Sequence, residues 1–271
     1  MQVPALRYGW MLVLAGLAAG CSLEKEIDID LPAFTPQLVV ECYLEPGQPY
    51  RLTLTESASY FDMPEQPQVP EAIVIITYQG RPDTLHYDPF VDKTQQKLYT
   101  HSSATRVTGL PGDVYTLQIT DQQGRRLTGT TTLMAPVPID SMQYKFNDRQ
   151  EAYIEARFTD KGDTEDYYLF SVHRDSTNKR AEVNYFVPDH LNNGQPIAFG
   201  TGFEFSPYDS LIVSLYHLEK QYFDFLTSVE EARNANDNPF AQPSRLHSTV
   251  QGGLGVFTNL AVDRKGTVLQ E

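Results

Sequence analysis

Apolar and polar residues alternate in short segments along most of this chain, and turn-forming residues separate the segments. In the first half, such segments span residues 38–44, 50–55, 72–78, 114–120 and 127–133. Alternation with a period of two buries one face of a strand, so each segment predicts a half-buried β-strand. The continuous apolar run at 73–76 predicts burial on both faces of its strand. About seven strands in roughly 100 residues predict a β-sandwich of the immunoglobulin or transthyretin type.

A proline-rich stretch separates this half from the next one. Pro136 and Pro138 exclude a helix and disrupt a central strand, which predicts a boundary near residue 134. Residues 219–233 carry apolar side chains at helical spacing and predict the one helix. The expected class is therefore mainly β: a sandwich over residues 36–134, then a second antiparallel β domain with that helix over residues 135–271. Further strands are expected at 152–158, 167–173 and 211–216, and a closing strand at 252–262.

The first twenty residues have the pattern of a secretion signal. Arg7 gives a weakly basic start, and the apolar run at 10–17 has the length of a signal core rather than the roughly 20 residues of a spanning helix. Ala18-Ala19-Gly20 directly before Cys21 is typical of a lipoprotein cleavage site. It predicts a signal peptide over residues 1–20 and acyl chains, such as palmitate, on Cys21. The alternatives are an ordinary secretory signal with a chance cysteine and an uncleaved anchor.

Residues 22–30 contain four acidic residues and one basic residue, directly after the predicted lipid cysteine. This cluster resembles the export signal by which Bacteroidota lipoproteins reach the outer face of the outer membrane. A solvated, flexible tether has the same charge pattern. We therefore expect residues 21–35 to form an acidic tether that holds the protein in the outer membrane through Cys21, with the folded part facing the cell exterior.

The chain carries 35 acidic and 21 basic residues, a formal net charge of −14. Such a protein is repelled by phosphate backbones, so a nucleic acid partner is not expected. The second cysteine, Cys42, has no disulfide partner within the chain if Cys21 is acylated. Cys42 shares its alternation parity with Leu38, Val40 and Leu44, which predicts a small buried core residue rather than a reactive thiol.

The order of several short motifs resembles one known family. These are LVVECYL at 38–44, VPEAIVIITYQG at 69–80, LPGDVYTLQI at 110–119, APVPIDSM at 135–142, NPF at 238–240 and GGLGVF at 252–257. Together, behind a lipoprotein signal, they resemble the Bacteroidota lipoprotein family catalogued as domain of unknown function 4249. Cys42 departs from the pattern, because glycine is expected there. The family is similar to accessory lipoproteins of TonB-dependent transporters and has no established catalytic residues. The resemblance therefore implies a TonB-dependent β-barrel receptor as partner and no cofactor.

Histidine spacing does not indicate a metal site. No two of the six histidines stand at ligand spacing. Strand parity places His173 with Leu169 and Ser171, and His217 with Leu215, which predicts hydrogen-bonded or half-buried histidines rather than metal ligands. The densest acidic cluster surrounds Gly162 and is the calcium candidate, although a charged hairpin turn has the same composition. Its residues are Asp160, Asp163, Glu165 and Asp166.

Glycines at 252, 253 and 255 lack the lysine and following helix of a phosphate loop, and they predict a bulge or strand start where two backbones approach closely. The better binding candidates are aromatic residues in connections between strands, because aromatic side chains in loops often carry recognition. Core packing is the alternative for the same residues. The candidates are Tyr60, Phe61, Tyr185, Phe186, Phe203, Phe205 and Tyr208.

These features favour a non-catalytic function. We expect a surface lipoprotein that serves as a binding or accessory module of a TonB-dependent nutrient uptake system, with its ligand left open. A structural or adhesive surface lipoprotein is the alternative. A surface hydrolase is also conceivable, because a catalytic triad assembled by the fold leaves no local sequence pattern.

Overall fold

A computed structural model of the protein describes residues 34–59, 67–190, 193–236 and 245–270. The predicted signal peptide, Cys21 and nearly all of the tether lie outside the described residues. The chain divides into two compact units, Met1–Thr35 and Pro36–Glu271, and only the second is described below. Its described residues form strands and one helix, which confirms the mainly β class. The helix among the described residues is not long and apolar enough to cross a membrane.

The first β-structure is a sheet of nine strands whose hydrogen-bonded order is β14-β7-β6-β3-β4-β5-β2-β1-β15. The long strand β4 belongs to two layers. Its first part pairs with β3 and its second part with β5, and the register shifts between Tyr87 and Phe90. The strands are β1 (Leu38–Leu44), β2 (Pro49–Glu56), β3 (Ile73–Tyr78), β4 (Arg81–Asp92), β5 (Lys97–Arg106), β6 (Val114–Thr120), β7 (Arg126–Thr132), β14 (Val250–Gln251) and β15 (Leu254–Asn259).

Alternating residues of these strands meet in one core, as the pattern predicts. Leu52 and Leu54 of β2 share it with Leu117 and Ile119 of β6, so the inner faces of both layers are buried against each other. Cys42 is fully buried in this core, and burial raises the pKa of its thiol to about 12. The predicted core role of Cys42 is therefore confirmed.

The third strand corrects one prediction. Ile73 is 57% exposed, so β3 is buried on one face and not on both. The apolar run at its centre is explained by pairing with β4 and β6, since β-branched residues favour strands on either face. Apolar and polar residues do not alternate regularly in strands β4 and β5. Most of β4 is exposed, and the buried residues of β5 are consecutive.

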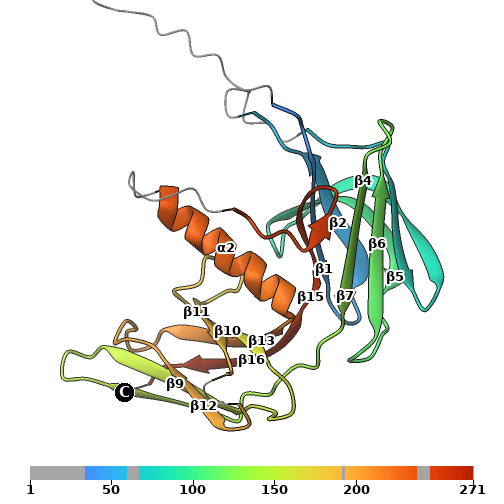
Figure 1. The fold of residues 1–271 in the computed structure, drawn as a ribbon. Coiled ribbons are helices and arrows are strands. Elements are labelled where there is room, and N and C mark those ends of the chain that lie inside the picture. Colours follow the sequence, from blue (N-terminus) through green and yellow to red (C-terminus); the bar gives the residue numbers. More distant parts are fainter. Residues whose placement is uncertain (1–33, 60–66, 191–192, 237–244, 271) are drawn as a thin grey trace, which may run out of the picture. The chain divides into compact units, whose positions relative to one another are not determined.

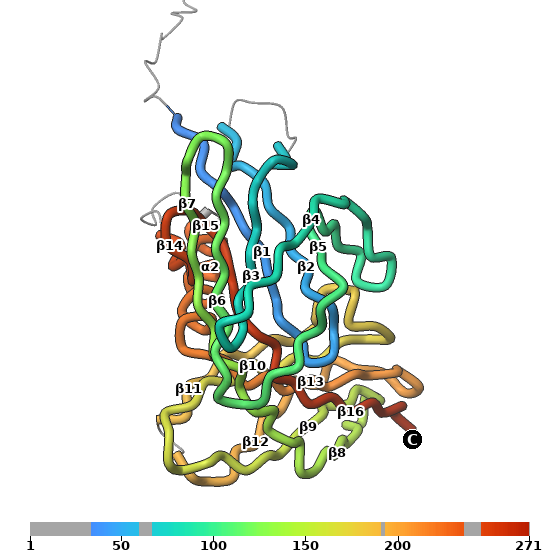
Figure 2. Tube along the Cα trace, turned by 90° about the vertical axis from the view of Figure 1, so that its right-hand side faces the viewer, coloured from blue at the N-terminus to red at the C-terminus, as the bar shows by residue number. Residues whose placement is uncertain are grey.

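The predicted closing strand at 252–262 is in fact two strands. Strand β15 runs parallel to β1, whereas β16 (Ala261–Val268) pairs antiparallel with β13 (Ser210–Leu218). Figure 2 shows β14 and β15 beside β7, and β15 also reaches β1, so the C-terminal part of the chain completes the first sheet.

Glycines make this edge possible. A Cβ atom built on Gly255 would lie 2.0 Å from the carbonyl oxygen of Val40, and one on Gly252 would lie 2.0 Å from that of Arg126. Both residues have positive φ, +114° and +81°. The predicted close backbone approach at these glycines is confirmed, and here it joins the two layers of the first sheet.

The second β-structure has two layers, a sheet of order β11-β10-β13-β16 and a sheet of order β12-β9-β8. Three phenylalanine rings pack between the layers. The Phe199 ring of β12 lies 5.2 Å from that of Phe170 of β10 and 5.6 Å from that of Phe158 of β9, measured between ring centroids. The remaining strands are β8 (Ser141–Phe146), β9 (Ala152–Thr159), β10 (Tyr167–Arg174), β11 (Val183–Pro188) and β12 (Pro196–Gly200).

The helix α2 (Lys220–Asn236) confirms the helix predicted at 219–233 and continues three residues beyond it. It lies along the sheet of β10, β11 and β13 (Figure 1). Tyr222 and Phe223 of α2 pack on Tyr167 and Leu218 of that sheet, and Val256 of β15 joins the same cluster. The helix therefore packs against strands of both β-structures.

Glu219, directly before α2, is a polar connection between these elements. Its carboxylate accepts hydrogen bonds from the Thr132 backbone N–H at 2.7 Å, from the Thr131 hydroxyl, and from the Asn259 amide at 3.3 Å. Asn259 also donates to the Thr132 carbonyl at 2.8 Å and accepts from the Met134 N–H at 2.9 Å. One carboxylate thus links the end of β7, the end of β15 and the start of α2.

We predict that Gly255→Ala destabilises the fold by about 3 kcal/mol or more, because the added Cβ collides with a backbone carbonyl of β1. The matched control is Gly80→Ala, which has φ +73° but no atom within 4 Å of the new Cβ and should cost about 1–2 kcal/mol. Urea unfolding measures both values. Equal costs would show that the close approach of β15 to β1 is not needed.

We predict that Glu219→Ala lowers the free energy of unfolding by about 2–3 kcal/mol, since it leaves the Thr132 N–H and the buried Thr131 hydroxyl without their acceptor. Glu230→Ala, an exposed position on the same helix, should change it by less than about 0.5 kcal/mol. Chemical denaturation of the three proteins tests this. Similar values for the two variants would contradict the role given to Glu219.

Candidate functional site: a cation-lined cleft and an aromatic pocket

Strand β10 presents different residues to its two sides. Tyr168, Phe170 and Val172 belong to the core of the second β-structure. Side chains alternate along a strand, so the intervening residues point the other way, and Leu169, Ser171 and His173 line a cleft. The same alternation therefore builds both the core and the floor of this cleft.

The cleft has a volume of about 500 Å³ and is lined by residues of both β-structures. Strands β1, β2 and β5 contribute one side, and β10, β13, β16 and α2 contribute the other. Its lining includes the polar and aromatic residues Tyr43, Glu45, Arg51, Lys97, Tyr99, Ser171, His173, Arg180, Tyr216, Tyr222 and Arg264.

Positive charge dominates this lining. The lining contains four cationic residues, Arg51, Lys97, Arg180 and Arg264, and one acidic residue, Glu45. Arg180 and Arg264 have no carboxylate within ion-pair distance among the described residues, and the guanidinium of Arg264 donates to the Tyr216 hydroxyl at 3.2 Å. Cations gathered in a concave, low-dielectric site attract anions even when the whole protein is acidic.

The other two cations are held in place by acidic and aromatic neighbours. Arg51 pairs with Asp92 at 2.8 Å and lies 4.5 Å from the ring centroid of Tyr99. Lys97 pairs with Glu41 at 2.8 Å and lies 4.3 Å from the ring centroid of Tyr43. These contacts fix the side chains, so the cleft is preorganised on this side, while the two arginines on the other side keep donors available.

Two buried polar atoms in the floor of the cleft have no hydrogen-bond partner, the Ser171 hydroxyl and His173 Nδ1. Their residues are 2% and 8% exposed. Burial, together with the charge of Arg264, lowers the pKa of His173 and so favours the neutral form of its ring. Buried polar groups are almost always paired, and these two offer a hydroxyl and an imidazole nitrogen to a bound molecule.

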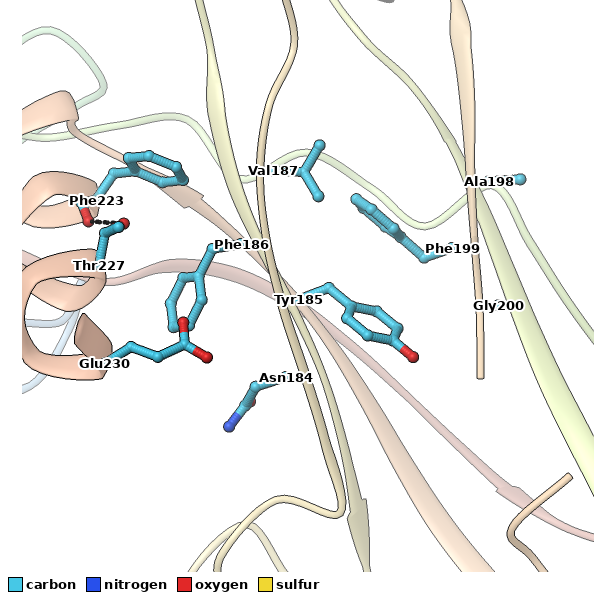
Figure 3. Close-up of a pocket in the computed structure, with 10 residues that line it drawn as sticks. All are labelled: Asn184, Tyr185, Phe186, Val187, Ala198, Phe199, Gly200, Phe223, Thr227 and Glu230. Carbon is cyan, nitrogen blue, oxygen red and sulfur yellow. Dashed lines mark hydrogen bonds between the residues drawn. The ribbon is translucent and has the colours of Figure 1, made fainter. Parts of the chain in front are cut away.

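A second cavity, of about 580 Å³, lies between strand β11, strand β12 and helix α2 (Figure 3). Figure 3 shows Phe186 turned toward Phe223 of the helix, and Tyr185 on the other side of the strand, near Phe199 of β12. Tyr185 also stacks against Phe170 with ring centroids 6.2 Å apart. In the described part of the chain, β11 pairs with β10 alone, so this aromatic pocket lies along a sheet edge.

The candidate aromatic residues are divided by the structure. Tyr185 and Phe186 line the aromatic pocket. Phe205 is 1% exposed and is a core residue, which matches the alternative reading for that position. Phe203 packs edge-on against Tyr153, and Tyr208 is 72% exposed, but neither lines a cavity described above. Tyr60 and Phe61 lie outside the described residues.

The residues of the cleft were not found from the sequence. Arg51, Lys97 and Arg264 stand on strands that are far apart along the chain, and an arginine or lysine on the outer face of a strand is ordinary. Only the pairing of β15 with β1 and of β16 with β13 brings them together. No local signal could have identified them.

The acidic candidates are also regrouped. Asp160 and Asp166 are buried and lie together with Asp189, which is not among the predicted calcium ligands. Asp163 and Glu165 are exposed and lie outside this group. His217 is hydrogen-bonded through both ring nitrogens, to the Ala135 carbonyl at 2.8 Å and to Asp166 at 3.0 Å, which confirms the prediction of a hydrogen-bonded histidine.

These observations define a protein of two β-structures with one cation-lined cleft and one aromatic pocket. The chain belongs to the family described as "Domain of unknown function (DUF4249)", whose family model matches residues 24–266. No functionally curated protein matches it.

The solved structures that match this chain share little sequence identity with it and have low TM-scores. The fibronectin domains FN1–FN3 of chicken CNTN1 are 10% identical, with 89% of this chain and 68% of that chain covered and a TM-score of 0.25. A segment of two fibronectin type III domains from chicken tenascin is 9% identical, with 88% and 100% covered and a TM-score of 0.24. A chain of a cytokine receptor complex is 9% identical, with 83% and 94% covered and a TM-score of 0.26. At these TM-scores the similarities carry no argument about function.

Proposed function

We propose that this protein is a non-catalytic binding module, held in the outer membrane by lipid on Cys21, which captures a small anionic ligand for a TonB-dependent receptor. The observation that carries the proposal is the cleft. In a chain of net charge −14, its lining holds four cations, and two of them, Arg180 and Arg264, have no ion-pair partner among the described residues. Tyrosines and two unpartnered polar atoms belong to the same lining. Arginine and tyrosine together suit ligands that carry carboxylate or sulfate groups on a ring or an apolar body.

The geometry of the described residues favours binding over catalysis. No serine or cysteine side chain in this part of the chain is hydrogen-bonded to a histidine ring. The Thr100 hydroxyl lies 3.0 Å from His101 Nδ1, but both residues are fully buried. The Cys42 thiol is also buried, with its pKa raised to about 12. A nucleophile needs an adjacent base or a lowered pKa. The transport role itself is supported by the resemblance to accessory lipoproteins, and the location by the lipoprotein signal before Cys21.

The cleft can be tested with the anionic dye 1-anilinonaphthalene-8-sulfonate as a probe, because it joins a sulfonate to an aromatic body. We expect saturable binding that weakens with salt. A double variant, Arg180→Gln with Arg264→Gln, should weaken it at least about 5-fold, since it removes both unpaired guanidinium groups. Arg149→Gln, an exposed position in a turn, is the matched control and should leave binding unchanged.

The result has a clear alternative outcome. Loss of dye binding in Tyr185→Ala but not in the double arginine variant would place the site in the aromatic pocket and contradict the cleft. Salt-independent binding, or an equal effect of Arg149→Gln, would contradict the role of the cations.

The membrane and partner parts of the proposal need a separate experiment. Cells that produce the full chain should incorporate labelled fatty acid into the wild type and into Cys42→Ala, but not into Cys21→Ala. Mild detergent extraction of the tagged wild type should recover a large outer-membrane β-barrel receptor. Labelling of Cys21→Ala would exclude the lipid anchor, and recovery of the lipoprotein alone would favour a structural or adhesive role over transport.

A further inference from the structure

Three aspartates from separate segments meet at one end of the second β-structure. Asp160 follows β9, Asp166 precedes β10, and Asp189 follows β11. All three are buried, with exposed fractions of 4%, 4% and 0%. One carboxylate oxygen from each lies within 4.8 Å of the others.

Two of these carboxylates have hydrogen-bond donors. Asp160 accepts from the Tyr168 hydroxyl and from the Gly194 N–H, the latter at 2.7 Å. Asp166 accepts from the Thr164 hydroxyl at 3.0 Å and is bonded to His217 Nε2, also at 3.0 Å. Each oxygen still has a free lone pair, because a carboxylate offers about four acceptor sites.

Asp189 is different, because neither of its carboxylate oxygens has a hydrogen-bond partner although the residue is fully buried. A buried, unpaired carboxylate is strongly unfavourable, and two further carboxylates nearby add repulsion. Among the described residues, the basic side chain that contacts the group is His217, and it is directed at Asp166. The positive charge that Asp189 requires is therefore not supplied by the described side chains.

We propose that Asp160, Asp166 and Asp189 bind a divalent cation and that this cation is Ca²⁺. Calcium–oxygen distances of about 2.3–2.6 Å let two ligand oxygens lie up to about 4.6–5.2 Å apart, so three carboxylate oxygens within 4.8 Å of one another are compatible with one calcium ion. A ligand set of oxygens alone favours calcium over zinc, and His217 adds no free nitrogen, because both of its ring nitrogens are already hydrogen-bonded. Water and neighbouring backbone carbonyls of the described residues would complete the six to eight ligands.

The backbone around the aspartates is packed for such a site. Gly162 and Gly194 approach so closely that a Cβ on Gly162 would lie 2.8 Å from the Cα of Gly194. This contact brings the connection after β9 against the connection before β12, and the Asn193 amide donates to the Thr164 carbonyl at 3.1 Å. A bound cation would join the ends of β9, β10 and β11, and its binding does not depend on the function proposed for the cleft.

The test uses the full chain after treatment with EDTA. Calcium at 100-fold above its Kd should raise Tm by about 5–10 °C, and magnesium should do so less. Terbium, a luminescent substitute for calcium, should be sensitised by the nearby Tyr168 and displaced by calcium. Asp189→Asn should abolish both effects and raise Tm in EDTA, because it removes a buried charge. Asp163→Asn, an exposed aspartate in the same turn, is the control and should behave as the wild type.

Several results would overturn the proposal. An unchanged Tm of the wild type in calcium, together with no terbium signal, excludes the site. Equal shifts with magnesium exclude a preference for calcium. A loss of binding in Asp163→Asn but not in Asp189→Asn would move the site to the exposed turn. If Asp189→Asn does not fold, Asp160→Asn serves as the second variant, and retained terbium binding in it would contradict the assignment.

Discussion

The carboxylate of Glu219 joins three segments that are distant in sequence, and the arrangement of the second unit depends on it. It accepts from Thr131 and Thr132 at the end of β7, and from Thr258 and Asn259 at the end of β15. Thr131, Thr258 and Asn259 are all buried. A charged acceptor that satisfies several buried donors contributes more than neutral hydrogen bonds do, because each donor would otherwise be buried without a partner.

This network also positions the cleft. Helix α2 starts directly after Glu219, and its Tyr222 lines the cleft and packs edge-on against Tyr43 of β1, with ring centroids 6.0 Å apart. Leu260, one residue beyond Asn259, donates its N–H to the Leu44 carbonyl at 2.9 Å and lines the same cleft. The two sides of the cleft are therefore held by the same contacts that hold the helix, and the cations on each side keep a defined separation.

Local sequence patterns predict the individual strands and the helix, but they do not predict which strands pair with each other. Alternation predicted the core faces of β1 and β6, helical spacing predicted α2, and the glycines at 252–255 predicted a close backbone approach. Strand β15 pairs with β1, more than 200 positions earlier in the chain, and nothing in either segment encodes that choice. The prediction that β3 is buried on both faces is wrong, because β-branched residues suit an exposed strand face as well as a buried one.

The cation-lined cleft and the aspartate cluster are the features that local sequence patterns predict least well, because long-range strand pairing brings the residues of each together. Asp166 and Asp160 could be suspected from their spacing, but Asp189 is distinguished by its burial and its lack of partners, which only the fold reveals. Strand β10 runs from the aspartate cluster to the cleft. Asp166 of the cluster precedes the strand, and His173 of the cleft lies seven residues later, about 23 Å away along an extended strand. Over that distance, two unit charges interact by only about 0.7 kcal/mol at an effective dielectric constant of 20. The aspartates beside one end of β10 and the cationic cleft beside the other end can therefore act with little influence on each other, and a change at one site should leave the other site intact.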